Sequence, residues 1–414
     1  MQKAATADTA IPPATGPASA AVKSGLTVLP IIVALSFCHM LNDLMQSMIP
    51  ALYPLLKSNL ELDFTQIGLI TLAFQLTASL LQPTVGTITD RKPQPYSLAI
   101  GMGSTLIGLI MLSMADSYLS VLLSAALIGV GSAVFHPEAS RVARMASGGR
   151  YGFAQSMFQV GGNLGSAIGP LLAAFIVLPH GQGSIAWFSM VALVAMGVLT
   201  WVGNWYAARR RPAAAAAARS AGRSSSLRRG RVIFCIFILM VLLFSKNVYS
   251  ASLGSYFVFY LMHHFGSTVA DSQVQLFIYM AAVATGTLLG GQFTDRIGRL
   301  PMIWISIVGA LPFTLLLPYA DLFWTSVLTI VIAMLMASAF PAIMVYGQEL
   351  VPGRVGMIAG MFFGFSFGLG GLGAAALGRI ADATSIEFVY HLTSFLPVLG
   401  LVTIFLPKLE HGRR

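Results

Sequence analysis

Residues 86–91 read GTITDR, and the same segment returns in the second half of the chain as GQFTDR at residues 291–296. Asp90 and Asp295 are therefore 205 positions apart. A second pair, GGRYG at 148–152 and PGRVG at 352–356, repeats at an offset of 204. Two matches at nearly one offset, close to half of the 414 residues, indicate an internal duplication. Such repeats are typical of transporters that bind their substrate between two halves.

Composition places the chain in a lipid bilayer. Apolar residues make up 56% of it and charged residues only 9%, whereas soluble domains contain about 25% charged residues. So few charges cannot coat a globule of this size, which excludes an ordinary soluble enzyme. Cys38 and Cys235 lie in separate apolar runs, so we expect neither a disulfide framework nor a zinc site, and no other metal site.

A transmembrane helix needs about 20 predominantly apolar residues, and twelve segments of the chain meet this requirement. Six of them precede residues 209–231, which read RRRPAAAAAARSAGRSSSLRRGR, and six follow. The predicted spans are 27–56, 64–88, 94–115, 118–146, 150–178, 184–208, 231–264, 270–293, 300–319, 321–349, 353–382 and 385–408.

These spans predict an all-α membrane protein with twelve transmembrane helices in two pseudo-symmetric six-helix bundles. The bundles are expected to comprise residues 27–208 and 232–408, joined by a basic cytoplasmic linker at 209–231. Residues 1–26 contain many Ala, Thr and Pro residues and no cleavable signal, and we expect them to form a disordered cytoplasmic tail. Residues 409–414 are predicted to form a second cytoplasmic tail.

The positive charges predict the orientation. If the N-terminus is cytoplasmic, all of the 24 Lys and Arg residues except Lys57, Lys246 and Arg379 lie on inward-facing loops and helix ends. The positive-inside rule then puts both termini in the cytoplasm, in the inner (plasma) membrane of a bacterium. The net charge of +10 is spread over these loops, so we expect the lipid bilayer, and no nucleic acid, as the partner of this charge.

The chain resembles a known family in its paired Asp–Arg loops and in four longer segments. They are SFCHMLNDLMQSMIPALYPLL at 36–56, GSAVFHPEASRVARMASGGRYG at 131–152, QSMFQVGGNLGSAIGPLLAA at 155–174 and GQELVPGRVGMIAGMFFGFSFGLGGLGAAALG at 347–378. With twelve spans split six and six, the chain resembles the major facilitator superfamily, and within it the bacterial exporters that give resistance to fosmidomycin. The resemblance covers all but the tail and the linker.

The resemblance implies a monomeric transporter that exports a small anionic drug, such as the phosphonate fosmidomycin, by alternating access. It implies the proton gradient as energy source, with no cofactor and no enzymatic activity. The chain departs from the family pattern in two places. The first loop reads DRKP at 90–93 and lacks the usual Gly, and the span 118–146 lacks the mid-span Arg of many drug antiporters.

The two Asp–Arg loops are candidates for a gate on the cytoplasmic side. An Asp at a helix end can accept hydrogen bonds from the N-terminus of a neighbouring helix, whose dipole favours negative charge. By pseudo-symmetry we expect Asp90 near residues 353–354 and Asp295 near residues 149–150. The alternative is that both loops are simple turns. The gate candidates are Asp90, Arg91, Arg150, Asp295, Arg296, Arg299 and Arg354.

The first span carries polar residues on one helix face, namely His39, Asn42, Asp43 and Gln46. A carboxyl this deep in a membrane must be paired, protonated or in a water-filled cavity. Asp43 is therefore a candidate proton carrier, and His39 is the alternative because histidine titrates near neutral pH. A purely structural ion pair is the competing interpretation.

Lys246 is the only cation predicted to lie deep in a span. Asn42 and Asn247 are 205 residues apart, so their helices are repeat partners and should face each other across a central cavity. Lys246 is either the ion-pair partner of Asp43 or the cation that binds an anionic substrate. If it is both, protonation of Asp43 would release Lys246 for the anion.

The span 118–146 carries His136, Pro137, Glu138 and Arg141. Glu138 has three possible roles: a salt bridge with Arg141, a partner of Arg91 in the gate, or a second proton site. The proline is expected to kink the helix beside the cavity, where His136 could contact substrate. The other predicted substrate-binding residues are His39, Asn42, Gln46, Gln75, Gln159, Asn163, Asn247, Tyr249, Tyr256 and Tyr346.

Other functions remain as alternatives. The same fold could take up or exchange an anionic metabolite with protons. A membrane-embedded enzyme or a sensor is a third alternative, but the sequence contains no phosphate-binding GxxxxGK[ST] segment, no paired nucleophile and base, and no soluble domain of useful size.

Overall fold

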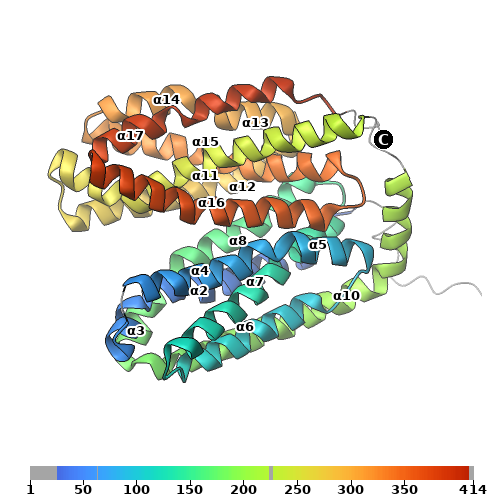
Figure 1. Cartoon of the computed structure of the whole chain (residues 1–414). Coiled ribbons are helices and arrows are strands. Elements are labelled where there is room, and N and C mark those ends of the chain that lie inside the picture. The colour runs from blue at the N-terminus through green and yellow to red at the C-terminus, as the bar shows by residue number, and fades with distance from the viewer. Residues whose placement is uncertain (1–25, 63, 223–226, 410–414) are drawn as a thin grey trace, which may run out of the picture.

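Each predicted span corresponds to one helix or to consecutive helices in a computed structural model, which describes residues 26–62, 64–222 and 227–409 (Figure 1). Nearly all of the predicted N-terminal tail (1–26) and of the C-terminal tail (409–414) lies outside the described residues. The fold is all-helical, as predicted.

The first half contains six spans, several of them made of two or more consecutive helical segments. Its elements are α2 (Leu29–Ala51), α3 (Tyr53–Leu60), α4 (Phe64–Leu80), α5 (Gln82–Arg91), α6 (Ser97–Ser113), α7 (Tyr118–Ala146), α8 (Tyr151–Leu172), η1 (Ala173–Val177), α9 (Leu178–His180), η2 (Gln182–Trp187) and α10 (Phe188–Gly222).

The second half repeats this order of six spans. Its elements are α11 (Arg229–Phe265), α12 (Val269–Ile297), α13 (Arg299–Ile307), α14 (Leu311–Leu316), η3 (Leu317–Tyr319), α15 (Leu322–Leu350), α16 (Val355–Ala383), α17 (Ile386–Ser394) and η4 (Leu396–Phe405).

Ten helical segments of the described chain are long and apolar enough to cross a membrane. The predicted spans outside this set are the third and the fifth. The third is α6, a shorter apolar helix of 17 residues, and the fifth is α8 with its continuation through η1 and α9. The arrangement is therefore consistent with twelve crossings and confirms a multi-pass membrane fold.

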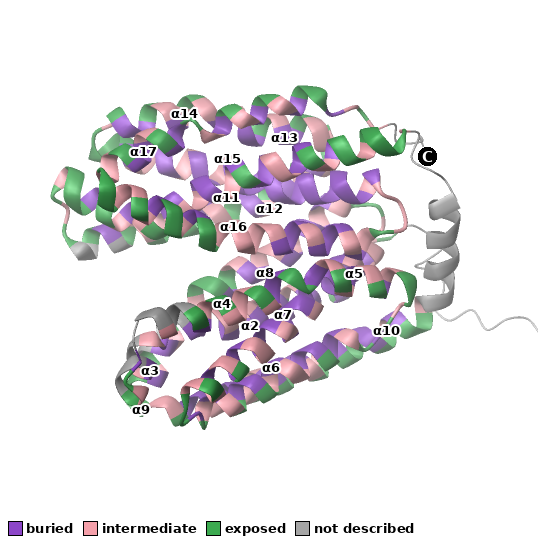
Figure 2. Ribbon diagram, viewed as in Figure 1, coloured by how far each residue is buried: buried purple, intermediate pink, exposed green. Residues whose placement is uncertain are grey.

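The halves form two bundles that pack against each other (Figure 1). Across the interface, α8 packs on α12 and α15, while α16 packs on α4, α5 and α7. The pairs α8–α12 and α5–α16 exchange under the repeat, so the interface itself is pseudo-symmetric. Large apolar side chains such as Ile100 and Phe237 lie exposed on the outside of the bundles, where lipid would cover them (Figure 2).

The predicted linker at 209–231 differs from the structure. Helix α10 continues through Gly222 and α11 already begins at Arg229, so helices occupy most of the segment. The physical reason is the run of alanines at 213–218, because alanine has the highest helix propensity of all residues. Composition indicated a solvated basic linker but did not account for this propensity.

The glycines of α8 allow it to pack closely against α2. A Cβ added at Gly161 would collide with the carbonyl of Ser36, and one added at Gly165 would collide with the carbonyl of Met40. Gly169 meets α2 in the same way. Small residues spaced four apart allow membrane helices to approach closely, so this stripe packs α8 within its own half.

The glycines of α16 make the equivalent close approach across the two halves. Added Cβ atoms at Gly360 and Gly364 would overlap the backbone of Gln82 and Ser79 in the first half. A glycine stripe on α8 therefore packs two helices of the first half together, whereas the equivalent stripe on α16 packs the two halves against each other.

We predict that Gly165→Ala lowers the free energy of unfolding by about 1–3 kcal/mol, because the new methyl group overpacks the α2–α8 contact. Gly197→Ala in α10 is the matched control, since nothing lies within 4 Å of its added Cβ. It should be neutral or stabilising, because Ala favours helix by up to about 1 kcal/mol over Gly. Thermal unfolding in detergent measures both, and equal midpoints would contradict the close approach.

Candidate functional site

Three titratable side chains meet between α2 and α7. The Asp43 carboxylate lies 3.3 Å from His39 Nε2, one turn away on α2, and 3.6 Å from His136 Nε2 on α7. The two Nε2 atoms are 3.2 Å apart. All three groups lie within 4.8 Å of one another. We call His39, Asp43 and His136 the histidine–aspartate cluster.

Backbone carbonyls orient both rings of the cluster. His39 Nδ1 lies 2.7 Å from the carbonyl oxygen of Phe158, and His136 Nδ1 lies 3.0 Å from that of Ser132. A carbonyl oxygen only accepts hydrogen bonds, so a hydrogen on each Nδ1 satisfies both contacts. The Ser132 hydroxyl, 3.3 Å from His136 Nδ1, is the other polar group beside that nitrogen. Both Nε2 atoms are therefore directed at each other and at Asp43.

The cluster is buried and surrounded by aromatic rings from both halves. His39 and His136 are 1% and 0% exposed, and Asp43 is 14% exposed. The His39 ring stacks on Phe158 at 4.0 Å between centroids. The His136 ring contacts Phe363 and Phe367 of α16, at 5.1 and 4.9 Å. One side of the cluster thus touches the second half of the protein.

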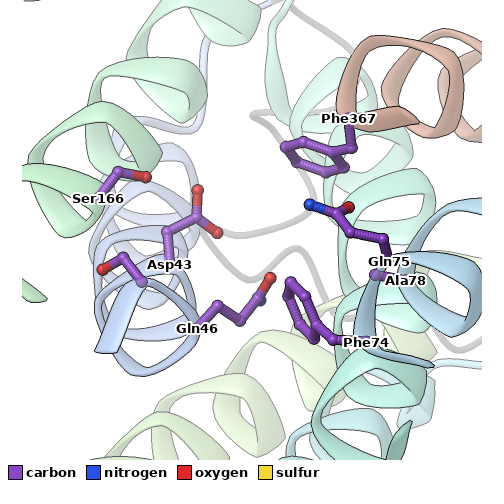
Figure 3. Close-up of a pocket in the computed structure, with 8 residues that line it drawn as sticks. Asp43, Gln46, Phe74, Gln75, Ala78, Ser166 and Phe367 are labelled. Carbon is purple, nitrogen blue, oxygen red and sulfur yellow. The ribbon is translucent and has the colours of Figure 1, made fainter. Parts of the chain in front are cut away.

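Asp43 also lines a cavity of about 170 Å³ (Figure 3). Of the predicted substrate-binding residues, Gln46 and Gln75 lie on its wall. Asp43 and Ser166 face the space from one side, and Phe367 and Gln75 face it from the other (Figure 3). The lining residues are Asp43, Gln46, Ser47, Phe74, Gln75, Ala78, Ser166 and Phe367.

Three amide atoms of the predicted substrate-binding residues have no hydrogen-bond partner among the described residues, and one of these residues, Gln46, lines the cavity. They are Asn42 Oδ1, Gln46 Nε2 and Gln159 Oε1, all buried. Buried polar groups are normally satisfied, so these atoms are candidates to bind a ligand or water. Asn42 also donates a hydrogen bond to Asp43 at 3.0 Å, which adds a fourth polar group to the cluster.

The expected ion pair between Asp43 and Lys246 is absent from this structure. Asp43 pairs with the two histidines instead, and the Lys246 ammonium lies 5.4 Å from the ring centroid of Phe340. Lys246 has no ion pair with any residue that the structure describes. Two histidines of the first half lie nearer to Asp43 than Lys246 of the second half does.

The remaining predicted cavity residues divide into two groups. Asn163 donates to Thr287 across the two halves at 3.3 Å, Asn247 donates to Ser366 at 3.1 Å, and Tyr256 donates to the carbonyl of Ala374. These side chains bridge helices.

Tyr249 and Tyr346 lie elsewhere than the predicted cavity wall. Tyr249 is 2% exposed within the apolar core of the second half. Tyr346 is 1% exposed, and its hydroxyl donates to the Pro407 carbonyl. Both rings are large enough to fill a core, and sequence alone cannot separate that role from a cavity wall.

Glu138 is paired with Arg141. The Arg141 Nε lies 3.0 Å from the Glu138 carboxylate, which is fully buried, and a second guanidinium nitrogen donates to the Tyr206 hydroxyl. This is the salt-bridge alternative from the sequence. Arg91, the other partner considered, lies exposed at the end of α5.

The contacts expected from the repeated Asp–Arg loops are present. The Asp90 carboxylate accepts hydrogen bonds from the backbone N–H groups of Gly356 and Met357, both at 2.9 Å. Asp295 accepts from those of Gly152 and Phe153 at 2.9 and 2.8 Å. Each carboxylate thus caps the N-terminus of a helix in the other half, two to four residues beyond the predicted positions.

Paired glycines make these caps possible. A Cβ on Gly86 would collide with the carbonyl of Gly356, and a Cβ on Gly152 would collide with that of Gly291. Both contacts lie on the side of the bundle that carries the connection from α10 to α11, which we call the linker side. The halves are therefore joined on the linker side.

The predicted gate arginines make no contact with the two aspartates. Arg91, Arg150, Arg296 and Arg354 are exposed. Arg150 lies over the Phe153 ring at 4.5 Å. Arg299 forms an ion pair with Glu349 at 2.9 Å within the second half.

Sequence reasoning missed a polar network at the centre of the linker side. Arg144 donates to Gln348 at 3.1 Å, and Gln348 donates to Ser140, which donates to Gln155. Arg144 and Gln348 are 204 positions apart, so they are repeat equivalents that contact each other. Equivalent residues can meet only near the pseudo-twofold axis, and the repeat offset was the signal that could have found them.

Comparison with known proteins agrees with this geometry. A sequence model of the Major Facilitator Superfamily matches residues 35–375 and 247–414. The chain is 55% identical over 394 residues to the fosmidomycin resistance protein of Escherichia coli (strain K12), covering 95% of the chain and 97% of that protein. It is 37% identical over 387 residues to an uncharacterized MFS-type transporter of Bacillus subtilis (strain 168), covering 93% and 95%.

Solved structures share the fold at low identity. The superfamily transporter FucP in its outward conformation aligns with a TM-score of 0.69 at 15% identity, covering 91% of this chain and 99% of that one. The human organic anion transporter MFSD10 aligns with a TM-score of 0.72 at 15% identity, covering 92% and 100%.

We predict that Asp295→Asn and Asp90→Asn each weaken closure of the linker side by about 1.5–3 kcal/mol, the contribution of a hydrogen bond to a charged group. An amide has one acceptor oxygen, whereas the carboxylate uses two. Spin labels at exposed Gln94 and Lys408, one in each half, should report longer distances in both variants. Asp116→Asn, at the exposed turn before α7, is the control, and a response equal to the control would reduce both aspartates to turn formers.

Proposed function

Because the chain belongs to the major facilitator superfamily and is a multi-pass membrane transporter, we propose that it exports a small anionic drug such as fosmidomycin in exchange for protons. The observation that carries the proposal is the histidine–aspartate cluster, which shares Asp43 with the cavity. The name of the relative from Escherichia coli supports the choice of drug.

Proton exchange needs a titratable group whose protonation responds to the ligand. An occupant of the cavity lies against Asp43 and beside Gln46, whose Nε2 has no partner among the described residues. Ligand and proton therefore act on the same carboxylate. A transporter that couples the two needs such a differential interaction, and Asp43 with His39 supplies it.

Lys246 is the proposed cation for the anionic part of the drug. An unpaired anion in the hydrocarbon region costs several kcal/mol, and Lys246 is not committed to a carboxylate among the described residues. The cluster and the lysine then act as two separate sites: the lysine binds the anion, and Asp43 carries the proton.

The electrical driving force favours export. Moving one negative charge out of a cell with a negative interior gains about 2.3 kcal/mol per 100 mV. Uptake of the same anion would work against this potential unless additional protons entered with it. For an anionic drug, efflux with proton entry uses both parts of the proton-motive force.

The proposed cycle alternates the closed linker side with an open one. The Asp90 and Asp295 caps join the halves on that side, which the distribution of Lys and Arg assigns to the cytoplasm. Opening to the cytoplasm then breaks both caps and the Arg144–Gln348 bond. This reading puts both termini in the cytoplasm of a bacterium, with the protein acting as a monomer in the inner membrane.

The second candidate is proton-coupled uptake or exchange of an anionic metabolite. The same cavity and cluster could serve it, since they carry no sign of direction. The two directions can be distinguished in inverted membrane vesicles. Radiolabelled fosmidomycin is placed on one side of the vesicle membrane, and a pH gradient is imposed. Export predicts drug accumulation against its gradient only when protons flow the opposite way, and co-directional flow would establish the alternative.

We predict that Asp43→Asn reduces gradient-driven export by about tenfold or more, the usual size of a lost coupling. Gradient-free counterflow, in which labelled drug exchanges for unlabelled drug, should survive better because it needs no proton step. Both are measured in proteoliposomes. Equal loss of both modes would make Asp43 structural and redirect attention to Glu138.

We predict that Lys246→Ala weakens binding of fosmidomycin by about 2–5 kcal/mol, the cost of removing one partner of a buried charge pair. Lys246→Arg keeps the charge and should bind more tightly than the alanine variant, and a neutral drug should be less affected. Calorimetry in detergent measures all three. If the alanine variant binds fosmidomycin as tightly as the wild type, the anion site lies instead at His39, His136, Arg141 or Arg144.

A further inference from the structure

We propose that His136 is a proton-coupling residue: it shares a single proton with His39 and Asp43 and links that proton to closure between the halves through Phe363 and Phe367. The inference deepens the proposed function, on which its role in transport rests. It assigns to His136 a part that sequence reasoning gave only to substrate contact.

With a hydrogen on each Nδ1, the hydrogen-bond geometry favours one further proton in the cluster. Both Nδ1 hydrogens point to backbone carbonyls, so two neutral rings would present two lone pairs to each other at 3.2 Å. The ionised carboxylate of Asp43, at 3.3 and 3.6 Å, supplies more lone pairs and no hydrogen. Such an arrangement has no donor, and buried polar atoms without partners are costly.

One added proton resolves the conflict. With one proton on Nε2 of either ring, the cluster consists of one imidazolium, one neutral imidazole and one carboxylate, and its net charge is zero. The same holds if the proton lies on Asp43. A buried site favours neutrality, so the three residues act as one unit that holds one proton, with its position distributed among them.

Among the described residues, the charged side chains that pair with Asp43 are His39 and His136. Helices α4 and α6, which pack on α7, carry no titratable side chain. The other titratable or charged groups on α7 and on the helices packed against α2 and α7 lie toward helix ends or in other pairs. They are Tyr53 and Lys57 on α3, Asp90 and Arg91 on α5, Tyr118, Glu138, Arg141 and Arg144 on α7, Tyr151 on α8, Tyr206 and the arginines of α10, and Arg379 and Asp382 on α16.

His136 connects the proton to the other half. Its ring lies edge-on to Phe367, at 79° between planes, and also contacts Phe363. Both phenylalanines belong to α16, the helix whose N-terminus Asp90 caps. A cation beside aromatic rings is stabilised, so the protonated cluster favours the closed linker side. When α16 moves away, His136 loses these rings and the proton can leave toward that side.

Within the described part of the chain, the cluster occurs once. At the repeat offset of 204–205, Phe244, Val248 and Phe340 stand in the second half where the first half has His39, Asp43 and His136. The second half therefore contacts the proton through aromatic rings but does not hold one. From this cluster we expect one proton per transport cycle.

The experiment measures closure, independently of transport. Spin labels at Gln94 and Lys408 report the ratio of closed to open linker side in nanodiscs between about pH 8 and about pH 6. We expect that acidification raises this ratio by about tenfold in the wild type. In His136→Phe, which keeps an aromatic ring against α16, the pH response should fall below about twofold.

Three further variants complete the test. His136→Gln replaces the phenylalanine variant if that protein does not fold, and the same loss is expected. Phe367→Leu keeps the nitrogen but removes one ring, and should weaken the pH response. His180→Phe, at an exposed histidine, makes the same exchange outside the cluster and should respond like the wild type.

Two results would overturn the inference. One is an unchanged pH response in His136→Phe. The other is loss of the wild-type response in EDTA, which would mean that a bound metal ion, and not a proton, joins the three groups. If instead the response depends on His136 but fosmidomycin is not transported, the shared proton stands and the proposed function fails.

Discussion

A charge inside a membrane must be paired, and the interior of this protein is organised by that constraint. Four carboxylates of the described spans, in the cluster, beside it on α7 and at the interface between the halves, each have a specific partner. Asp43 has two imidazoles, Glu138 has a guanidinium, and Asp90 and Asp295 each have two backbone N–H groups. Lys246 rests against an aromatic ring and has no counter-ion among the described residues. It is therefore the group with the most to gain from an anionic ligand.

The two halves share their structural contacts but differ in their titratable residues. Closure on the linker side is pseudo-symmetric, because both aspartate caps, both glycine pairs and the Arg144–Gln348 contact obey the two-fold relation. The titratable chemistry is not symmetric, since the histidine–aspartate cluster belongs to the first half and Lys246 to the second. A symmetric frame lets the halves rock against each other, while an asymmetric interior gives each half a separate task.

Sequence alone predicted the fold and the frame, because both leave repeated, local signals. Apolar length marks the spans, and the offset of 204–205 marks the aspartate caps to within a few residues. The site was only partly predictable. His39 and Asp43 share one helix face and were identified, but the third member, His136, reaches them from another helix, and no spacing rule encodes that approach. Tyr249 and Tyr346 show the opposite error, since a polar tip does not reveal whether a ring lines a cavity or fills a core.

The aspartate caps have a consequence for how this protein can evolve. Their partners are backbone amides, which every amino acid except proline supplies. The bonds use backbone amides alone, and positions 152 and 356 are glycines whose added Cβ would meet the facing backbone. A change at Asp90 or Asp295 therefore has no side chain across the contact that could compensate it. Suppressor mutations of such a change should lie in other helix contacts. Correlated substitutions in related sequences should not reveal the contact that joins the two halves.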